Sequence, residues 1–186
     1  MENRKIKRVT KSEILDEASE KGEILAATAQ KSLSETLSAK IQESGLVPAI
    51  EHCNVVAQPL VDSLSMAYGA TIRRVSSKLR NPVDKPDQIE QEILEAYEYA
   101  MENSVSLESN VQEVGDQEIL FTKPILISNP LCLNCHGTIG KEILDENYDA
   151  IKSLYPQDSA VGYNLGDLRG MWSIRFQKKE LIMKMD

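Results

Sequence analysis

Two stretches of helical periodicity fill the first third of the chain. Between residues 12 and 44, apolar side chains recur every three or four positions until Gly45, and this spacing predicts one long helix with a charged outer face. After this break a second helix is predicted over 48–68, before Gly69. Its apolar stripe consists of Cys53, Ala57, Leu60 and Leu64. Cys53 is therefore expected on the buried face of the second helix.

The rest of the pattern predicts short strands around two shorter helices. Alternation and β-branched residues, bounded by Gly, Pro and Asn, mark the strands, and Asp87 has the position of a helix cap. The predicted strands are 70–80, 111–114, 118–127 and 170–179, and the predicted helices are 87–103 and 141–155. Gly115 and Asp116 form a hairpin turn between the middle strands. Helices that flank an antiparallel sheet define an α+β class.

Composition and charge narrow the function classes. The chain has 186 residues, 41% hydrophobic and 27% charged, so it is long enough for one globular domain with a substantial core. Its 21 basic and 29 acidic residues give a net charge of −8, which argues against a nucleic acid partner. The basic cluster RKIKR at 4–8 is too short to reverse that conclusion.

Candidate chemistry is concentrated in NPLCLNCHG, residues 129–137. This stretch holds two of the three cysteines and one of the two histidines. Cys132, Cys135 and His136 form C-x-x-C-H, in which both thiols can add to haem vinyl groups while the adjacent imidazole binds the iron. The motif therefore predicts one covalently attached haem c.

Two other uses of a C-x-x-C pair fit less well. A thioredoxin-like dithiol needs a βαβ setting and a helix N-terminus that lowers the pKa of the first thiol, whereas here Asn129 and Pro130 precede the motif and glycines follow it. A structural zinc site needs four ligands. The other candidates are His52 and Cys53, which do not form a second pair at zinc-binding spacing.

Haem attachment also predicts where the protein works. Bacteria attach haem c outside the cytoplasmic membrane, yet the first 30 residues lack the apolar core of a secretory signal and no apolar run reaches 18 residues. We expect a signal or a membrane anchor to precede this chain, and a location in the bacterial periplasm or elsewhere on the extracytoplasmic side. With both motif thiols bound to haem, Cys53 is left unpaired and no disulfide framework is expected.

Four segments together resemble the haem c PAS-like sensor domains of bacteria. They are AIEHCNVVA, IRRVSSKLRNPVDKPD, PLCLNCHG and VGYNLGDLRGMWSI, in that order. The resemblance runs from about residue 20 to 178, so we expect one domain over 20–186, preceded by an extension and the start of the long helix at 1–19. It implies a PAS-like fold, one covalent haem, and iron held between His136 and a cysteine, which corresponds to Cys53.

The residues themselves leave the second iron ligand open. Without the resemblance, Cys53 is interpreted as a small buried hydrophobe, the usual role of a free cysteine. His52 is an equally good ligand chemically, but the adjacent position turns it about 100° away from the apolar stripe. Met66 and Met101 would give the His/Met ligation of electron carriers, although lone methionines at core spacing usually fill gaps. A Cys53 thiolate would bind ferric iron best, and reduction of the iron would weaken the bond between them.

The candidate surroundings of the haem are mainly cationic. Arg74, Lys78 and Arg80 project from one face of the first predicted strand, where they would either pair with haem propionates or face solvent. Arg169 and Trp172 lie in the last family-like segment, and the resemblance makes a place at the haem edge plausible. By physics alone, Trp172 is a large core side chain.

Three functions remain. A redox or diatomic-gas sensor is favoured, with a small diatomic ligand or a redox partner as its counterpart and ligand exchange on reduction. A monohaem electron carrier is the alternative and must keep both ligands in both oxidation states. An enzyme such as a peroxidase is disfavoured, because only His52 remains for acid-base chemistry. The long first helix suits a membrane anchor or signalling partner outside this chain, a homodimer, or simple packing on the sheet.

Overall fold

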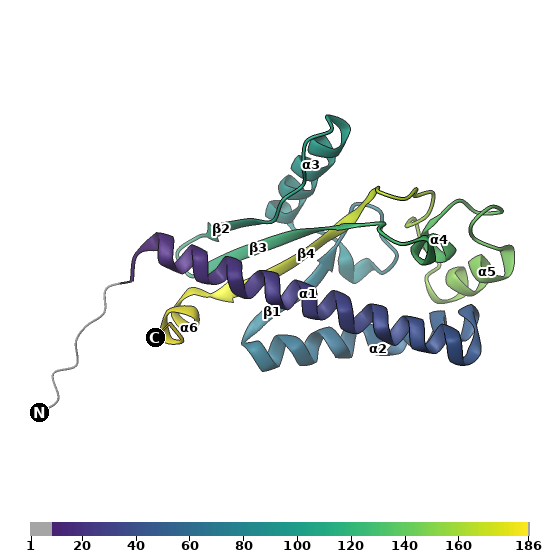
Figure 1. Cartoon of the computed structure of the whole chain (residues 1–186), viewed down its shortest axis with the longest axis horizontal. Helices are drawn as coiled ribbons and strands as arrows, with labels where there is room; N and C mark the ends of the chain where they lie inside the picture. The colour runs from purple at the N-terminus through teal and green to yellow at the C-terminus, as the bar shows by residue number, and fades with distance from the viewer. Residues whose placement is uncertain (1–8, 186) are drawn as a thin grey trace, which may run out of the picture.

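A four-stranded antiparallel sheet in the order β1-β4-β3-β2 forms the centre of the molecule (Figure 1). The computed structural model describes residues 9–185, and the basic cluster at 4–8 lies outside them. The strands are β1 (Ala70–Val75), β2 (Asn110–Val114), β3 (Glu118–Leu126) and β4 (Leu168–Gln177). β2 and β3 form the expected hairpin, whose turn contains Gly115 at φ 61°. The predicted α+β class is confirmed.

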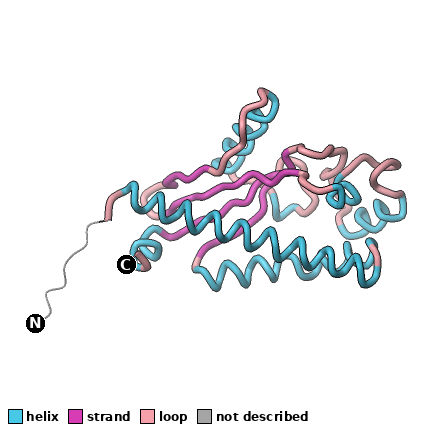
Figure 2. Tube along the Cα trace, viewed as in Figure 1, coloured by secondary structure: helices cyan, strands magenta, loops and turns pink. Residues whose placement is uncertain are grey.

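Two long helices, α1 (Lys11–Ser44) and α2 (Leu46–Tyr68), form an antiparallel pair across one face of this sheet, as Figure 2 shows. α1 begins with a capping box in which Thr10 and Glu13 exchange side-chain-to-backbone hydrogen bonds. Gly45, at φ 87°, makes the turn between the helices, as the sequence predicts. Within residues 9–185, no helix is both long enough and apolar enough to cross a membrane.

The first half of α1 is packed closely against the sheet. Leu25 and Ala29 of α1 and Phe121 and Ile174 of the sheet are at most 1% exposed. A Cβ placed on Gly22 would lie 2.2 Å from Cγ of Phe121, so only glycine allows the helix to come this near. This core fixes the helix pair on the sheet.

The opposite face of the sheet carries α3 (Gln88–Glu102), which begins at the predicted cap and projects away from the sheet (Figure 1). The contact includes buried polar groups. The Tyr97 hydroxyl lies 3.0 Å from Oγ1 of Thr122, and the Ser173 hydroxyl donates to Oε1 of Glu90 at 2.7 Å. These pairs satisfy the polar atoms that this face buries.

The predicted strand 70–80 is wrong beyond Val75. The backbone N–H of Ser76 donates to the carbonyl of Asp84 at 3.1 Å, so the chain leaves the sheet ladder at this residue. It then folds back through the short 3₁₀ helix η1 (Pro82–Asp84). A local alternation of residue types cannot reveal this long turn, because its hydrogen bonds are made to residues outside the strand.

The chain also departs from the predictions before α5 and after β4. α5 (Asp145–Leu154) begins later than residue 141, because the preceding residues form a turn in which Oε2 of Glu142 accepts the Thr138 N–H at 3.0 Å. β4 stops at Gln177, and the chain continues as a short helix, α6 (Lys178–Met183), that strand alternation does not predict.

Candidate functional site

The C-x-x-C-H motif forms a short helix of its own, α4 (Pro130–His136), which follows β3 (Figure 1). The side-chain oxygen of Asn129 caps this helix by accepting the Leu131 N–H at 2.8 Å, and a proline in the first turn suits its start. Gly137 ends it, where a Cβ would lie 2.7 Å from the Leu133 carbonyl oxygen. The residues that flank the motif therefore set its length.

The three motif side chains share one face of α4. Cys132, Cys135 and His136 are spaced i, i+3 and i+4, and all three are half-buried. Burial raises the pKa of the Cys135 thiol, with Arg80 acting in the opposite direction, so this thiol is not activated as a nucleophile. The described strands pair only in antiparallel fashion and form no βαβ unit. Both observations disfavour the dithiol alternative.

His136 is oriented by a backbone carbonyl. Its Nδ1 lies 2.7 Å from the carbonyl oxygen of Ala160. A carbonyl can only accept, so Nδ1 carries the proton and the lone pair of Nε2 is available to a metal. Burial, reinforced by the positive charges of Arg169 and Arg80, holds the pKa of His136 well below its usual value. The imidazole is therefore neutral, which is the form that binds metals.

Arg80 points at the backbone of the motif. Its Nε and Nη2 lie 3.1 and 3.3 Å from the two carboxylate oxygens of Asp158. Nη2 also donates to the carbonyls of Cys135 at 2.6 Å and of Ala160 at 3.3 Å. The Asp158 side chain is 0% exposed and the Arg80 side chain 15%. Two of the three guanidinium nitrogens are thus engaged by Asp158 and by the backbone of the motif and its supporting loop.

Cys53 and His52, adjacent on α2, interact with different neighbours. Burial raises the pKa of Cys135 most, and charge on Cys53 raises it further. Cys53 therefore lies within electrostatic range of α4. His52 contributes instead to lowering the pKa of Glu43 on α1, after the larger effect of Lys40. The two side chains therefore diverge, as their adjacent positions on a helix predict.

Arg74 and Trp172 are register partners on β1 and β4 and face the helix pair. Trp172 is 2% exposed and its Nε1 donates to the side chain of Gln30 at 3.3 Å, so it belongs to the core under α1. The Arg74 side chain is half-buried near the end of its strand and, within residues 9–185, makes no hydrogen bond or ion pair, although its charge counteracts the rise that burial causes in the pKa of Asp84. Of the two, Arg74 is left available to an anionic group.

Tyr163 is a site residue that the sequence pattern did not single out, although it lies in the last family-like segment. Its ring meets the His136 ring edge to face, with centroids 6.1 Å apart. Lys78 Nζ lies 4.7 Å and Arg169 Cζ 5.7 Å from the centre of the Tyr163 ring. Because Lys78 and Arg80 lie beyond the end of β1, the expected row of three cations on one strand face is wrong. The loops nevertheless gather these cations around the motif.

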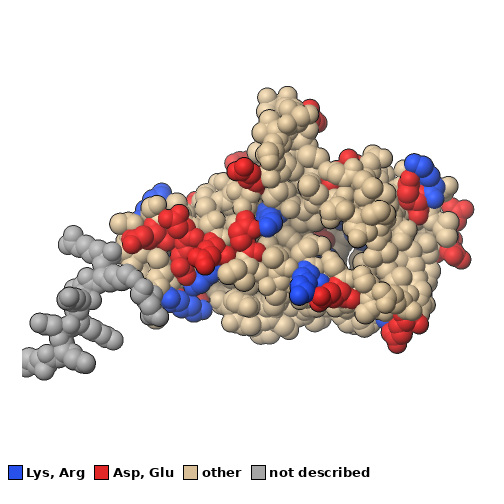
Figure 3. Space-filling view, viewed as in Figure 1, with Lys and Arg blue, Asp and Glu red and all other residues tan. Residues whose placement is uncertain are grey.

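An apolar space lies beside the second half of α1. The fully buried side chains of α1 end at Ala29, and the stripe that continues through Leu33, Leu37 and Ile41 is only half-buried. Figure 3 shows the surface hollowed beside this part of α1. Besides burial, the charge of Arg74 helps to lower the pKa of the His136 imidazole, so these two groups lie within electrostatic range of each other. An imidazole, a nearby guanidinium and half-buried apolar side chains are the kinds of group that suit a flat apolar ligand with an anionic edge.

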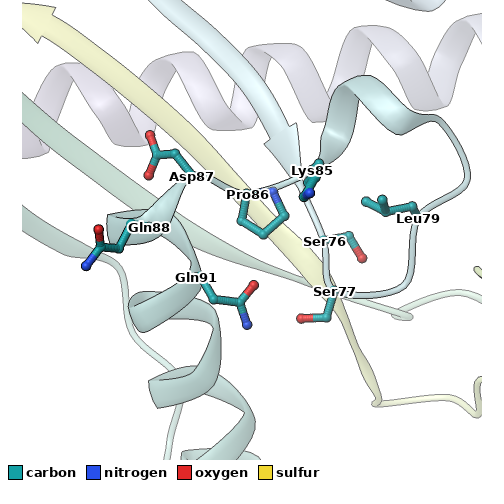
Figure 4. Close-up of a pocket in the computed structure, with 8 residues that line it drawn as sticks. All are labelled: Ser76, Ser77, Leu79, Lys85, Pro86, Asp87, Gln88 and Gln91. Carbon is teal, nitrogen blue, oxygen red and sulfur yellow. The ribbon is translucent and has the colours of Figure 1, made fainter.

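Two other hollows lie away from the motif face. One, of about 410 Å³, separates the loop after β1 from the start of α3 (Figure 4). Its lining residues are Ser76, Ser77, Leu79, Lys85, Pro86, Asp87, Gln88 and Gln91. The second, of about 450 Å³, lies at the start of α2 and is lined in part by Asn134 and Glu142. In the described part of the chain, no three His, Cys, Asp or Glu side chains are grouped as metal ligands.

The sequence profile of the Tll0287-like family matches residues 11–177. The chain belongs to the Tll0287-like family. The crystal structure of the cyanobacterial haem protein Tll0287 is similar in fold, with a TM-score of 0.59 and 24% sequence identity over 85% of this chain and 94% of that chain. No curated protein matches. These findings confirm the family resemblance drawn from the four sequence segments and the PAS-like α+β fold.

Proposed function

We propose that this member of the Tll0287-like family is a monohaem c-type cytochrome that acts as a redox or diatomic-gas sensor. The observation that carries the proposal is the face of α4, where two thiols lie beside an imidazole whose Nδ1 is held by the Ala160 carbonyl, which leaves the lone pair on Nε2. The similar Tll0287 is a haem protein, which supports the same cofactor. Bound haem would supply an iron that changes oxidation state and takes up small gases.

The residues of the site would divide the work of holding the haem. Cys132 and Cys135 would carry the two thioether bonds, and His136 would hold the iron through Nε2. Arg74 would pair with a propionate, because its half-buried side chain has no hydrogen bond or ion pair among the described residues and its charge reaches His136. The half-buried apolar stripe of α1 would exclude water from the ring.

Cys53 is proposed as the second axial ligand and as the switch. Burial raises the pKa of its thiol, so the thiolate is favoured only beside a strong positive charge. Bound ferric haem would supply that charge. Reduction would lower it, so Cys53 would then be a weaker ligand and would take up a proton from solvent. Such a change would suit a sensor of small ligands, whereas an electron carrier would keep its ligand.

The cellular setting follows from the covalent chemistry. We propose an extracytoplasmic location, in the periplasm of bacteria, with an anchor or a signalling partner outside this chain. The response would leave the site through α2, which carries Cys53, and through α1, which packs on both α2 and the sheet. We propose a sensor and not an enzyme, and His52, whose charge acts on Glu43 of α1, is given no role in it.

Absorption spectra test this proposal directly. The chain is produced with the haem c maturation machinery, and spectra are recorded in the ferric and dithionite-reduced states, with and without carbon monoxide. Cys53→Ser is compared with the matched neighbour His52→Ala. We expect Cys53→Ser alone to change the ferric spectrum and the reduced wild-type protein to take up carbon monoxide. If neither variant changes the ferric spectrum and the reduced protein does not bind carbon monoxide, the sensor function is rejected in favour of the electron carrier.

A further inference from the structure

The segment between α5 and β4 holds the end of the motif helix. The backbone N–H groups of Gly162 and Tyr163 donate to the carbonyls of Gly137 and His136 at 2.8 and 2.9 Å. Ala160, in the same segment, supplies the carbonyl that accepts the Nδ1 proton of His136. The position of one loop carbonyl therefore determines the orientation of the imidazole.

That carbonyl is fixed by a buried ion pair. Oδ1 of Asp158 accepts the Ala160 N–H at 3.1 Å, which makes a tight turn around the carboxylate. Arg80 closes the arrangement, because one guanidinium bonds both oxygens of Asp158 and the carbonyls of Ala160 and Cys135. Its planar fork reaches four acceptors that a single ammonium group could not serve together.

We infer that Arg80 and Asp158 are positioning residues that set both the orientation and the donor strength of His136 through the carbonyl of Ala160. This inference rests on the proposed function. The Ala160 carbonyl is shared between His136 Nδ1 at 2.7 Å and Arg80 Nη2 at 3.3 Å. An arginine proton on this oxygen draws electron density away, so the oxygen accepts less strongly from the imidazole.

The consequence for the iron has a definite sign. Without Arg80, the Ala160 carbonyl accepts more strongly from Nδ1, His136 becomes the more electron-rich ligand, and a positive charge near the iron is lost. Both changes favour the ferric state. Replacing Asp158 by Asn removes a buried negative charge and leaves the positive charge of Arg80 uncompensated, which favours the ferrous state.

The test compares four variants of the full chain: Arg80→Gln, Arg80→Lys, Asp158→Asn and the control Arg73→Gln. Arg73 is a matched control because it also donates to two backbone carbonyls, those of Val83 and Lys85 at 3.2 and 2.5 Å. It lies on the face of β1 opposite to Arg74 and the helix pair. Arg80→Lys keeps the charge and loses the fork, so it separates positioning from charge at a distance.

Two measurements are made on each variant. In the haem-free chain, ¹⁵N NMR follows the proton on Nδ1 of His136 and its exchange with water. In the haem-loaded chain, a redox titration gives the midpoint potential. For Arg80→Gln we expect slower exchange of the Nδ1 proton, because the Ala160 carbonyl then accepts it more strongly, and a tenfold shift toward the oxidised form, which is about 59 mV downward for a one-electron couple. Arg80→Lys should show the same slower exchange with a smaller shift in potential. Asp158→Asn should shift the potential upward.

Wild-type values for His136 exchange in Arg80→Lys and Asp158→Asn would overturn the inference, as would equal effects of Arg73→Gln and Arg80→Gln. If Arg80→Gln fails to fold, the lysine and asparagine variants still decide. If the wild-type chain attaches no haem, the proposed function fails, whereas the NMR measurement on the haem-free chain still decides whether Arg80 orients His136.

Discussion

The two halves of α1 meet their surroundings in different ways. The first half presents small and apolar residues to the sheet and buries them completely. These residues are Ile14, Ala18, Gly22, Leu25, Ala26 and Ala29. The second half continues the same periodicity, yet its apolar side chains Leu33, Leu37 and Ile41 are only half-buried. One helix thus belongs to a closed core at one end and to an open apolar wall at the other.

The polar groups show the same division. Around α4, cations and backbone carbonyls form a network centred on Arg80, while under the first half of α1 the sheet offers apolar side chains such as Phe121 and Ile174. The comparison indicates that the fold is stabilised at one end of the helix pair, and the proposed function would have the haem held at the other. Each of the following variants tests this separation.

The largest effect is expected from the motif itself. The double substitution Cys132→Ser with Cys135→Ser removes both attachment points, so covalent haem should be lost completely while the haem-free fold is retained. Haem staining of denatured gels and intact mass measure attachment, and circular dichroism measures the fold. Cys53→Ser is the control and should keep its covalent haem. Persistent covalent haem in the double variant would contradict the assignment.

A pair of leucine truncations compares the two halves of α1 directly. Leu25→Ala removes a side chain that is 1% exposed and should cost about 2–5 kcal/mol of the free energy of unfolding. Leu37→Ala, in the half-buried stretch, should cost below about 1 kcal/mol in the haem-free chain, because that site has no closed packing to lose. Urea unfolding of both variants measures the costs. Equal costs would show that the second half of α1 is as closely packed as the first.

Much of this architecture could be predicted from sequence, because its signals are local. The helix pair has unbroken periodicity with Gly45 between its members, and the spacing of Cys132, Cys135 and His136 is itself the motif. The end of β1 at Val75 could not be predicted, since it depends on a hydrogen bond from Ser76 to a distant carbonyl.

The support of His136 was equally hidden from sequence. Asp158 and Ala160 lie in a loop without periodicity, and Arg80 reaches them only after the chain has folded back from the sheet. Their roles depend on acceptor geometry and not on residue type. Tyr163 lies within a family-like segment, but only the edge-to-face contact with His136 assigns it to the site.

A smaller effect is expected from adding a methyl group at Gly22, where α1 touches the sheet. Alanine has a higher helix propensity by about 1 kcal/mol, but its Cβ would overlap the buried Phe121 ring, and overpacking of this kind costs about 1–3 kcal/mol. Gly22→Ala should therefore be destabilised, as read from its urea midpoint. Phe121→Leu makes room for the added methyl group. Gly22→Ala should therefore cost less stability in the Phe121→Leu background than in the wild-type protein. A stabilised Gly22→Ala would show that α1 moves away from the sheet at little cost.

The smallest effect is expected at Glu113 on β2, where exposed charges join α1 and α6 to the sheet. Hydrogen bonds from Lys11 and Lys178 lower the pKa of Glu113 from its usual value of 4.5 to about 2. Because the folded-state pKa is the lower one, the stabilisation is complete above about pH 4.5 and is lost as the pH falls toward 2. Glu113→Gln should therefore lower the urea midpoint slightly at pH 6. The decrease should be smaller in high salt and should shrink progressively below pH 4.5. Glu108→Gln, an exposed control, should leave the urea midpoint unchanged. A loss in Glu113→Gln that stays constant from pH 6 to pH 3 would show that the side chain contributes through packing and not through its charge.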